Sequence, residues 1–394
     1  MLFLLLISIL TFLLAVGTFF FEIYIFKNAP YLKNIKSEKP IDTSLTIVIP
    51  AYNEELNITK CLKALSEIKR PSDNFKILVV DDLSTDKTFS EAKKFKEKIF
   101  NNSEELEIIS SGVRPKEKNW VGKNWACFVG SKKTNSEWIL FIDADVIIGK
   151  NCIYNALSKA YDDNIDLLSL APKVNCNCLA EWMVQPIMTS LLTIGFPVTS
   201  TNDNRNKTSF AAGPFMLFKR NSYELIGGHE STCEEVVEDI ALAKKIKNIN
   251  LKLIFLIAIK DISLNMYQDL DSLIEGWSKN WFLGLDKDLP KSISASIFVI
   301  LNFSFPWLLF FLSITISLNN HSLISLSLGL VSFIAIAIYF CKRLWLEANY
   351  GINSKYWYLN GIGGLIVFYI SILSIYKTYT GNGWTWKGRN LFTN

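Results

Sequence analysis

The stretch TIVIPAYNEE (Thr46–Glu55) joins a short apolar run to a proline, which we expect to end a strand, and to a group of polar residues. Two further apolar runs, FKILVV at 75–80 and EWILFID at 137–143, each lead into a polar turn and then into a helical pattern. Short apolar strands that alternate with helices are typical of a mainly parallel sheet covered on both faces. The sequence therefore predicts an α/β domain, which we place at residues 44–290.

The composition indicates a soluble domain joined to membrane segments, because half of the 394 residues are apolar and yet a fifth are charged. The net charge of +4 is small, and we expect no nucleic-acid partner. The seven cysteines form no disulfide framework, which fits reduced thiols in a domain that faces the cytoplasm. Since the chain has two histidines, a bound metal has to rely on carboxylates, and this favours Mg²⁺ or Mn²⁺ over zinc.

Residues 1–26 predict an N-terminal transmembrane anchor. They are apolar except for Glu22, they are long enough to span a bilayer, and no cleavage site of small residues follows them. The positive-inside tendency then places the next domain in the cytoplasm, because four lysines follow the anchor: Lys27, Lys33, Lys36 and Lys39.

Three apolar runs after the α/β domain predict a C-terminal transmembrane region at 292–376 and a tail at 377–394. We therefore expect a multi-pass membrane protein. Pro306 should kink the first run. Glycines in the last run allow close helix packing or a broken helix. The runs cover residues 292–317, 323–341 and 356–376, and the glycines are Gly361, Gly363 and Gly364.

One further apolar stretch lies inside the predicted soluble domain, at residues 179–198. Pro186, Pro197 and Glu181 make it a poor membrane span. It fits either an interfacial helix that lies against lipid or an ordinary core helix.

Carboxylates end the second and third predicted strands, where ligands bind in open α/β sheets. Asp82 ends the second strand and is suited to accept a hydrogen bond from a nucleobase edge such as uracil N3–H. Asp143 and Asp145 end the third strand, and a cation between them would bridge the protein to a nucleotide diphosphate. Each of these motifs alone also fits a simple polar turn.

Two more motifs complete the set. In NWVGKNWAC (Asn119–Cys127), Gly122 lets the backbone approach a ligand, and Lys123 supplies a point charge suited to a diphosphate. Glu238 and Asp239 open a later helix. An acidic first turn also complements the helix dipole, but this does not account for four carboxylates within six residues.

Taken in their order along the chain, the motifs resemble those of the inverting family 2 nucleotide-sugar glycosyltransferases, which have a GT-A fold with a Rossmann-like sheet. The resemblance is greatest to the membrane-bound branch that includes carotenoid- and hopanoid-associated glycosyltransferases. It covers roughly residues 44–290, is close at Ala211–Glu230, and recurs in TWKGRN (Thr385–Asn390).

The chain departs from the family pattern at two places. It has Gly213-Pro214 where the family usually has Gly-Gln, which puts one polar contact of the pocket in doubt. Processive polysaccharide synthases of the family carry Q-x-x-R-W, whereas this chain reads EGWSKNW with Asn280 at the position of the arginine. The second departure argues against a processive synthase.

The resemblance implies roles for the matching residues. Asp82 would contact the base, Lys123 would lie near the diphosphate, and Asp143 would face the ribose. Asp145 would hold Mg²⁺ or Mn²⁺. The catalytic residues would be Asp239, as the base that a helix N-terminus keeps ionised, and Glu238. The whole nucleotide-sugar site would consist of Pro50, Tyr52, Glu54, Asp82, Lys123, Asp143 and Trp277.

The expected activity is the transfer of a sugar from a nucleotide-sugar, preferably a UDP-sugar, to a hydroxylated membrane lipid such as a carotenoid or another polyisoprenoid. One alternative is a membrane polysaccharide synthase of the same family. Another is a membrane protein with a degenerate nucleotide pocket and no activity, which the intact D-x-D and E-D pairs disfavour.

Overall fold

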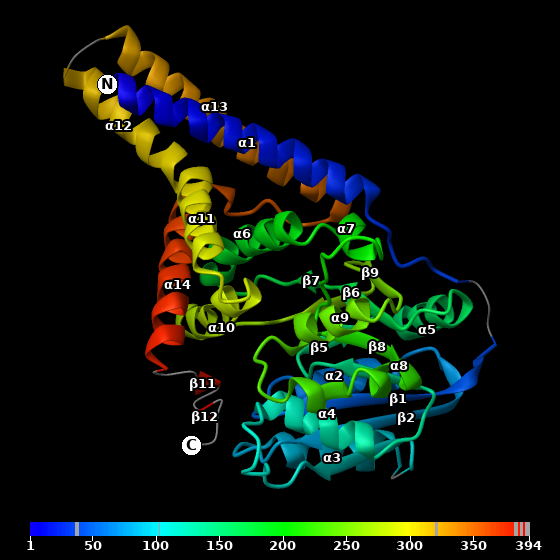
Figure 1. Ribbon diagram of the computed structural model, residues 1–394. Coiled ribbons are helices and arrows are strands. Elements are labelled where there is room, and N and C mark those ends of the chain that lie inside the picture. The colour runs from blue at the N-terminus through cyan, green and yellow to red at the C-terminus, as the bar shows by residue number, and fades with distance from the viewer. Residues whose placement is uncertain (36–38, 102, 320–321, 382–384, 387–388, 391–394) are drawn as a thin grey trace. The chain divides into compact units, whose positions relative to one another are not determined.

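The computed structural model describes residues 1–35, 39–101, 103–319, 322–381, 385–386 and 389–390. The chain forms two compact units, each assembled from separate segments of the sequence (Figure 1). The helical unit contains Met1–Asn28, Cys176–Pro197 and Tyr267–Gly383. The sheet unit contains Ala29–Asn175, Val198–Met266 and Trp384–Asn394.

The central sheet of the sheet unit has, within the described residues, seven strands in the order β3-β2-β1-β4-β8-β6-β9. Strand β1 pairs in parallel with β2 and β4, β2 with β3, and β6 with β9, whereas β8 runs antiparallel to β4 and β6. The predicted mainly parallel α/β sheet is confirmed. The strands are β1 Ile41–Ala51, β2 Ser72–Asp81, β3 Leu106–Ser110, β4 Trp138–Ile142, β6 Leu167–Ala171, β8 Phe215–Lys219 and β9 Leu253–Ile257.

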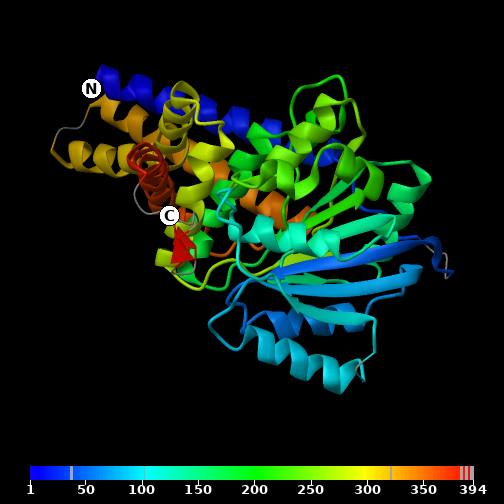
Figure 2. The same ribbon diagram turned by 60° about the horizontal axis from the view of Figure 1, so that its bottom comes forward.

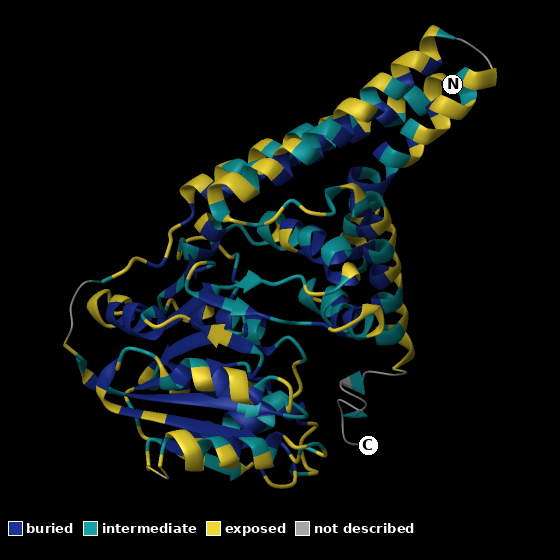
Figure 3. Cartoon of the chain, turned by 180° about the vertical axis from the view of Figure 1, so that it is seen from behind, coloured by how far each residue is buried: buried dark blue, intermediate teal, exposed yellow. Residues whose placement is uncertain are grey.

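Helices cover both faces of this sheet because alternate strand residues point to opposite sides (Figure 2). Ile47 and Ile49 pack with residues of α2 and α5, whereas Val48 packs with residues of α4 and α9. Figure 3 shows the buried residues concentrated in these strands. The helices of the unit are α2 Ile58–Ser66, α3 Thr88–Ile99, α4 Gly122–Lys132, α5 Cys152–Asp162, α7 Val198–Asn202, α8 Arg220–Leu225 and α9 Glu238–Asn248, with a 3₁₀ turn at Gly228–Thr232.

Two small sheets complete the sheet unit. Strand β10 (Ile262–Leu264) lies between β5 (Val146–Ile148) and β7 (Lys173–Val174). Near the C-terminus, β11 (Thr385–Trp386) pairs antiparallel with β12 (Arg389–Asn390). Because β12 belongs to the sheet unit, Arg389 can take part in the site described below.

The helical unit contains, among the described residues, four helical stretches long and apolar enough to cross a membrane: Leu2–Asn28, Leu289–Asn319, Leu323–Tyr350 and Trp357–Thr380. Its elements are α1 Leu2–Asn28, α6 Leu179–Gly195, α10 Leu270–Gly284, α11 Leu289–Val299, a π-helical turn Ile300–Ser304, α12 Phe305–Asn319, α13 Leu323–Tyr350, a 3₁₀ turn Trp357–Leu359 and α14 Asn360–Thr380.

The expected irregularity at Pro306 takes the form of the π-helical turn Ile300–Ser304. Proline has no N–H, so the carbonyl of Asn302, four residues earlier, lacks its ordinary helical donor. The Tyr339 hydroxyl of α13 donates to that carbonyl oxygen. A side chain of a neighbouring helix thus supplies the hydrogen bond that the Asn302 carbonyl lacks within its own helix.

The glycines of α14 permit close helix packing, as expected. A Cβ at Gly363 would collide with the main-chain oxygen of Met183 in α6, and one at Gly361 would lie 2.7 Å from Trp307 Cδ1. Helix α6 continues through Pro186 and packs against α1, α10 and α14. Two segments inside the 44–290 limits, α6 and α10, therefore pack with the apolar helices, and those limits stay a prediction.

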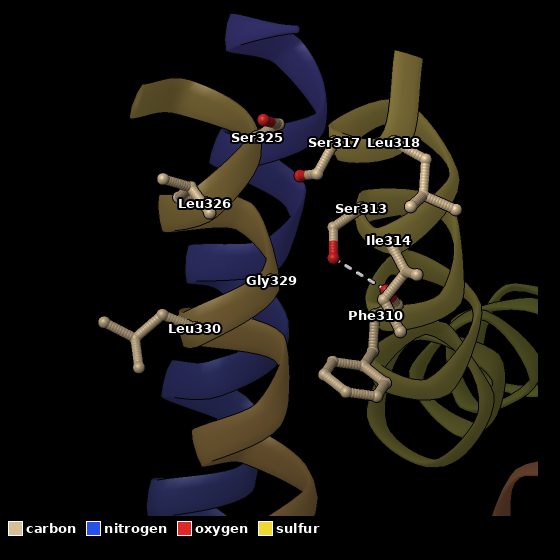
Figure 4. A pocket seen from close by; sticks show the side chains of 9 residues that line it. All are labelled: Phe310, Ser313, Ile314, Ser317, Leu318, Ser325, Leu326, Gly329 and Leu330. Atoms are coloured by element: carbon tan, nitrogen blue, oxygen red, sulfur yellow. Dashed lines mark hydrogen bonds between the residues drawn. The ribbon is translucent and has the colours of Figure 1, made fainter. Parts of the chain in front are cut away.

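A buried ion pair joins α1 to α13. Lys342 Nζ lies 3.0 Å from Glu22 Oε1, and the Ser190 hydroxyl of α6 donates to the same carboxylate. Both charged side chains are buried. A groove of about 400 Å³ lies between α12 and α13. Figure 4 labels the residues that line it. A Cβ at Gly329, one of these residues, would lie 2.7 Å from Ser313 Oγ.

Candidate active site

The end of β1 carries the first group of predicted site residues. Pro50 does not end the strand as expected, because β1 pairs with β2 through Ala51. Pairing with β4 stops at Val48, so the missing proline N–H costs no hydrogen bond on that side. Tyr52 and Glu54 follow, and the Glu54 amide donates to Thr88 Oγ1 at 2.6 Å.

Asp82, at the end of β2, is buried among donors. Its carboxylate accepts from Ser111 Oγ at 3.0 Å, from Arg114 Nη2 at 3.2 Å and from Arg389. Arg389 Nη1 also donates to the main-chain oxygen of Asp82 at 3.0 Å. Burial raises the pKa of Asp82 to about 6, although Arg389 and Ser111 act in the opposite direction.

Two of these partners were not identified from the sequence as site residues. Arg114 lies 32 positions from Asp82, and Arg389 lies 307 positions away. The signal for Arg389 was the family-like TWKGRN segment, whereas Arg114 had none. Asp81 was also missed: one of its carboxylate oxygens is buried and accepts no hydrogen bond within the described residues.

Gly122 makes room for this cluster. A Cβ at this position would lie 2.5 Å from Asp82 Oδ2 and 2.7 Å from Arg114 Nη2, so a larger residue would displace them. The close approach that we expected of Gly122 is therefore made, in this structure, to charged groups of the chain itself.

Lys123 follows Gly122 and bridges two acids, one at the end of β4 and one at the start of α9. Its Nζ lies 2.8 Å from Asp143 Oδ1 and 2.8 Å from Glu238 Oε1. Burial lowers the pKa of Lys123, but the two carboxylates outweigh it, so the pKa lies well above its ordinary value. The ammonium group is therefore a fixed positive charge between β4 and α9.

Asp239 lies beside this bridge at the start of α9. Its Oδ2 accepts from the Gly213 amide at 2.9 Å and its Oδ1 from the Ile240 amide at 2.8 Å. A Cβ at Gly213 would lie 3.0 Å from Lys123 Nζ and 3.1 Å from Asp239 Oδ2, which explains a glycine here. Pro214 leaves this contact intact, because the Gly213 amide makes it.

The surroundings of Asp239 oppose the effect of the helix N-terminus, which we expected to keep this carboxylate ionised. Burial, followed by the negative charge of Glu238, raises the pKa of Asp239 to about 7. Lys123 and the two amide donors lower it, but not enough. A carboxylate with this pKa is matched to proton transfer near neutrality.

Asp145 lies in the turn between β4 and β5. Burial, and then the negative charges of Asp145, Glu54 and Asp143, raise the pKa of the Cys61 thiol far above its ordinary value. These three carboxylates therefore concentrate negative potential in one region, which favours a cation. No three His, Cys, Asp or Glu side chains in the described residues form a metal-binding group by themselves, but Mg²⁺ needs only one or two protein carboxylates beside substrate phosphates.

Trp277 differs from the other predicted site residues, because it belongs to α10 of the helical unit. Its Nε1 donates to Gln185 Oε1 of α6 at 3.2 Å. The role expected for it stays a prediction.

Comparison with known proteins agrees with the fold and the motifs. Residues 46–227 match the family described as Glycosyl transferase family 2. This segment of the chain is therefore similar to members of that family. It is similar to proteins named 4,4'-diaponeurosporenoate glycosyltransferase. The one from Staphylococcus haemolyticus is 28% identical over 273 residues, 68% of this chain and 69% of that protein. One from Staphylococcus aureus is 28% identical over 257 residues, 64% of this chain and 65% of that protein.

A solved structure shows the same fold. The mannosyltransferase of Pyrobaculum calidifontis, in complex with GDP-Man and Mn²⁺, superposes with a TM-score of 0.56 at 16% identity. The match covers 96% of this chain and 100% of that chain. The expected GT-A fold is thus confirmed.

Proposed function

We propose that this protein is an inverting glycosyltransferase that moves a sugar from a nucleotide-sugar, preferably a UDP-sugar, to a hydroxylated membrane lipid such as a carotenoid or another polyisoprenoid. The observation that carries this proposal is the arrangement of Lys123, Asp143, Glu238 and Asp239. It brings the Lys123 ammonium group, at the start of α4, together with an acid at the end of β4 and with Asp239 at the start of α9, whose pKa is about 7. The four apolar helices and the names of the relatives support a lipid acceptor.

In the proposed reaction, Asp239 removes the proton of the acceptor hydroxyl as its oxygen bonds to the anomeric carbon. The bond from that carbon to the diphosphate oxygen breaks, and the nucleoside diphosphate leaves on the opposite face, so the anomeric centre inverts. Lys123 stabilises the negative charge that grows on the leaving group. Asp81 and Asp82 form the nucleobase end of the site, with Tyr52 as a stacking surface and Pro50 and Glu54 beside it.

The residues fit a divalent cation at Asp145, with Asp143 nearby, because carboxylate charge is concentrated there. Mg²⁺ or Mn²⁺ bound at this place would supply further positive charge to the diphosphate. The catalytic domain is proposed to face the cytoplasm of a multi-pass protein, since lysines follow the first apolar helix.

A carboxylic acid acceptor is the second candidate, and the relatives' name favours it. A diaponeurosporenoate is named as a carboxylate, and a carboxylate is already ionised at neutral pH. It would need no base, so Asp239 would be less important. The product would be a sugar ester, which mild alkali cleaves, whereas the glycoside of a hydroxyl survives.

The test is an extraction experiment. Membranes that contain the protein are incubated with a panel of labelled UDP-sugars and with hydroxylated or carboxylated carotenoids, and the product is partitioned into organic solvent. Alkali-stable label in the organic phase supports a hydroxyl acceptor, and alkali-labile label supports the acid. Label confined to the aqueous phase or to long polymer contradicts both and favours a polysaccharide synthase.

A further inference from the structure

One side-chain amide holds the loop that leads into the proposed base. Asn124 Nδ2 donates to the main-chain oxygens of Thr232 at 2.7 Å, of Glu235 at 2.8 Å and, at 3.3 Å, of Cys233. Asn124 is fully buried, so water does not compete for these bonds. Three carbonyls that converge on one amide group fix the path of residues 232–235.

The same loop is held a second time by the start of α4. The Val121 amide donates to the main-chain oxygen of Cys233 at 2.8 Å. Glu235 is followed by only two residues before α9 begins with Glu238 and Asp239. The position of the carboxylates at the start of α9 therefore depends on a loop that α4 holds.

Helix α4 is a rigid support for this task. It packs against β1 and β2, and its Ala126 and Cys127 are fully buried in the core on that face of the sheet. Three consecutive residues of its first turn then contact three parts of the site. Gly122 adjoins Asp82, Lys123 bridges Asp143 and Glu238, and Asn124 holds the loop.

We propose that Asn124 is a positioning residue that sets the place of the Asp239 carboxylate relative to the Lys123 bridge. This inference rests on the proposed function in one respect, namely that Asp239 acts as the base. Asn124 itself touches no reacting atom. The body of α9 is anchored independently by Leu242, Ala243 and Ile246 in the core, so removal of the Asn124 amide loosens the start of the helix and leaves the rest in place.

The test compares Asn124→Ala and the near-isosteric Asn124→Asp with Asn155→Ala. Asn155 is a matched control, because it is equally buried in the sheet unit and holds a different loop, accepting from the Ile35 amide at 3.0 Å. Each variant is purified in detergent and measured for unfolding temperature, UDP binding, steady-state kinetics and hydrogen exchange of residues 228–242. The donor is the UDP-sugar that labels lipid in the extraction experiment.

Both Asn124 variants should lower kcat by about 10- to 100-fold, the effect of misplacing a reacting group by about 1 Å, with the Kd for UDP within about twofold of wild type. Exchange at 228–242 should rise in these variants. Asn155→Ala should lower the unfolding temperature about as much as the Asn124 variants do, but kcat and exchange at 228–242 should stay as in the wild type. Unchanged kcat, or unchanged exchange at 228–242, overturns the inference. A wild-type protein without transferase activity refutes the proposed function instead, and the exchange measurement still decides whether Asn124 holds the loop.

Discussion

The guanidinium carbon of Arg389 lies 3.9 Å from the centre of the Tyr52 ring. A residue near the C-terminus thus stacks on the proposed nucleobase surface and also binds Asp82, whose pKa it lowers. We expect Arg389→Ala to raise the pKa of Asp82 above about 6, so that UDP binding weakens near pH 6.5 and recovers near pH 8.5.

Calorimetry of UDP binding at the two pH values measures this effect, with Arg389→Lys as the variant that keeps the charge. Tighter UDP binding by Arg389→Ala at both pH values would contradict the prediction. It would show that, in the absence of UDP, the guanidinium group occupies the place of the nucleobase.

Asp145→Ala should abolish most transfer while leaving the fold intact, because the proposed cation acts on the diphosphate of the donor. EDTA should have the same effect on the wild type, and Mg²⁺ or Mn²⁺ should restore it. Full activity in EDTA would exclude the metal role. The unfolding temperature of the variant serves as the control for folding.

Asp239→Asn should lower kcat by about 10²–10⁴-fold with donor binding largely kept, as expected for loss of a general base. The wild-type kcat should rise with pH through about 7, because only the ionised carboxylate accepts a proton. Unchanged turnover would move the base to Glu238 or Glu235, or indicate a carboxylate acceptor.

Ionisation of Asp239 should increase kcat but lower the stability of the fold. The pKa of Asp239 in the folded protein lies above its ordinary value of 3.8. The stability that comes from this shift is therefore fully present below pH 3.8 and is lost as the pH rises through about 7. Asp239→Asn should therefore raise the unfolding temperature at pH 8 and not at pH 4.

Lys247→Met should destabilise the sheet unit by about 1.5–3 kcal/mol, the range for a hydrogen-bonded charged group. The buried ammonium group donates to the carbonyls of Thr201 at 2.9 Å, Asp203 at 3.0 Å and Thr208 at 2.7 Å. Methionine fills the space but leaves these acceptors unpaired. Lys245→Met, on the less buried part of the same helix, is the control and should change the unfolding temperature little.

The C-terminal end should lie on the same side of the membrane as the catalytic domain. Three full crossings after the sheet unit would put it on the other side, yet Arg389 belongs to the sheet unit. We expect the last apolar helix, α14, to be re-entrant or interfacial, which agrees with Lys377, Lys387 and Arg389 beyond it.

Cysteine labelling with an impermeant reagent tests this topology in a background without native cysteines. A cysteine in place of Thr393, which lies outside the described residues, should behave like Ser103→Cys in the sheet unit and stay unlabelled in intact cells. Asn319→Cys, at the end of α12, should be labelled. Labelling at position 393 from outside would reject a re-entrant or interfacial α14.

The sheet was predictable because apolar periodicity is a local property, and the acids at its strand ends follow from the same pattern. The partners of those acids were not predictable, since Arg114 and Arg389 reach Asp82 only through the folded chain. The helix-dipole argument for Asp239 did not include burial beside Glu238, which raises the pKa of this carboxyl group. For α6, sequence periodicity could not tell a core helix from an interfacial one, because its apolar residues have similar partners in either setting.

The discontinuity of the sheet unit has a consequence for biogenesis. A ribosome completes residues 41–264, which hold every strand of the main sheet, long before it adds Arg389. The sheet can form early, but Asp82 gains its second guanidinium partner only when the apolar helices have been made and the last strand returns. The sheet can thus fold before Arg389 joins Asp82, and a product that stops within α14 would carry the acids without this cation.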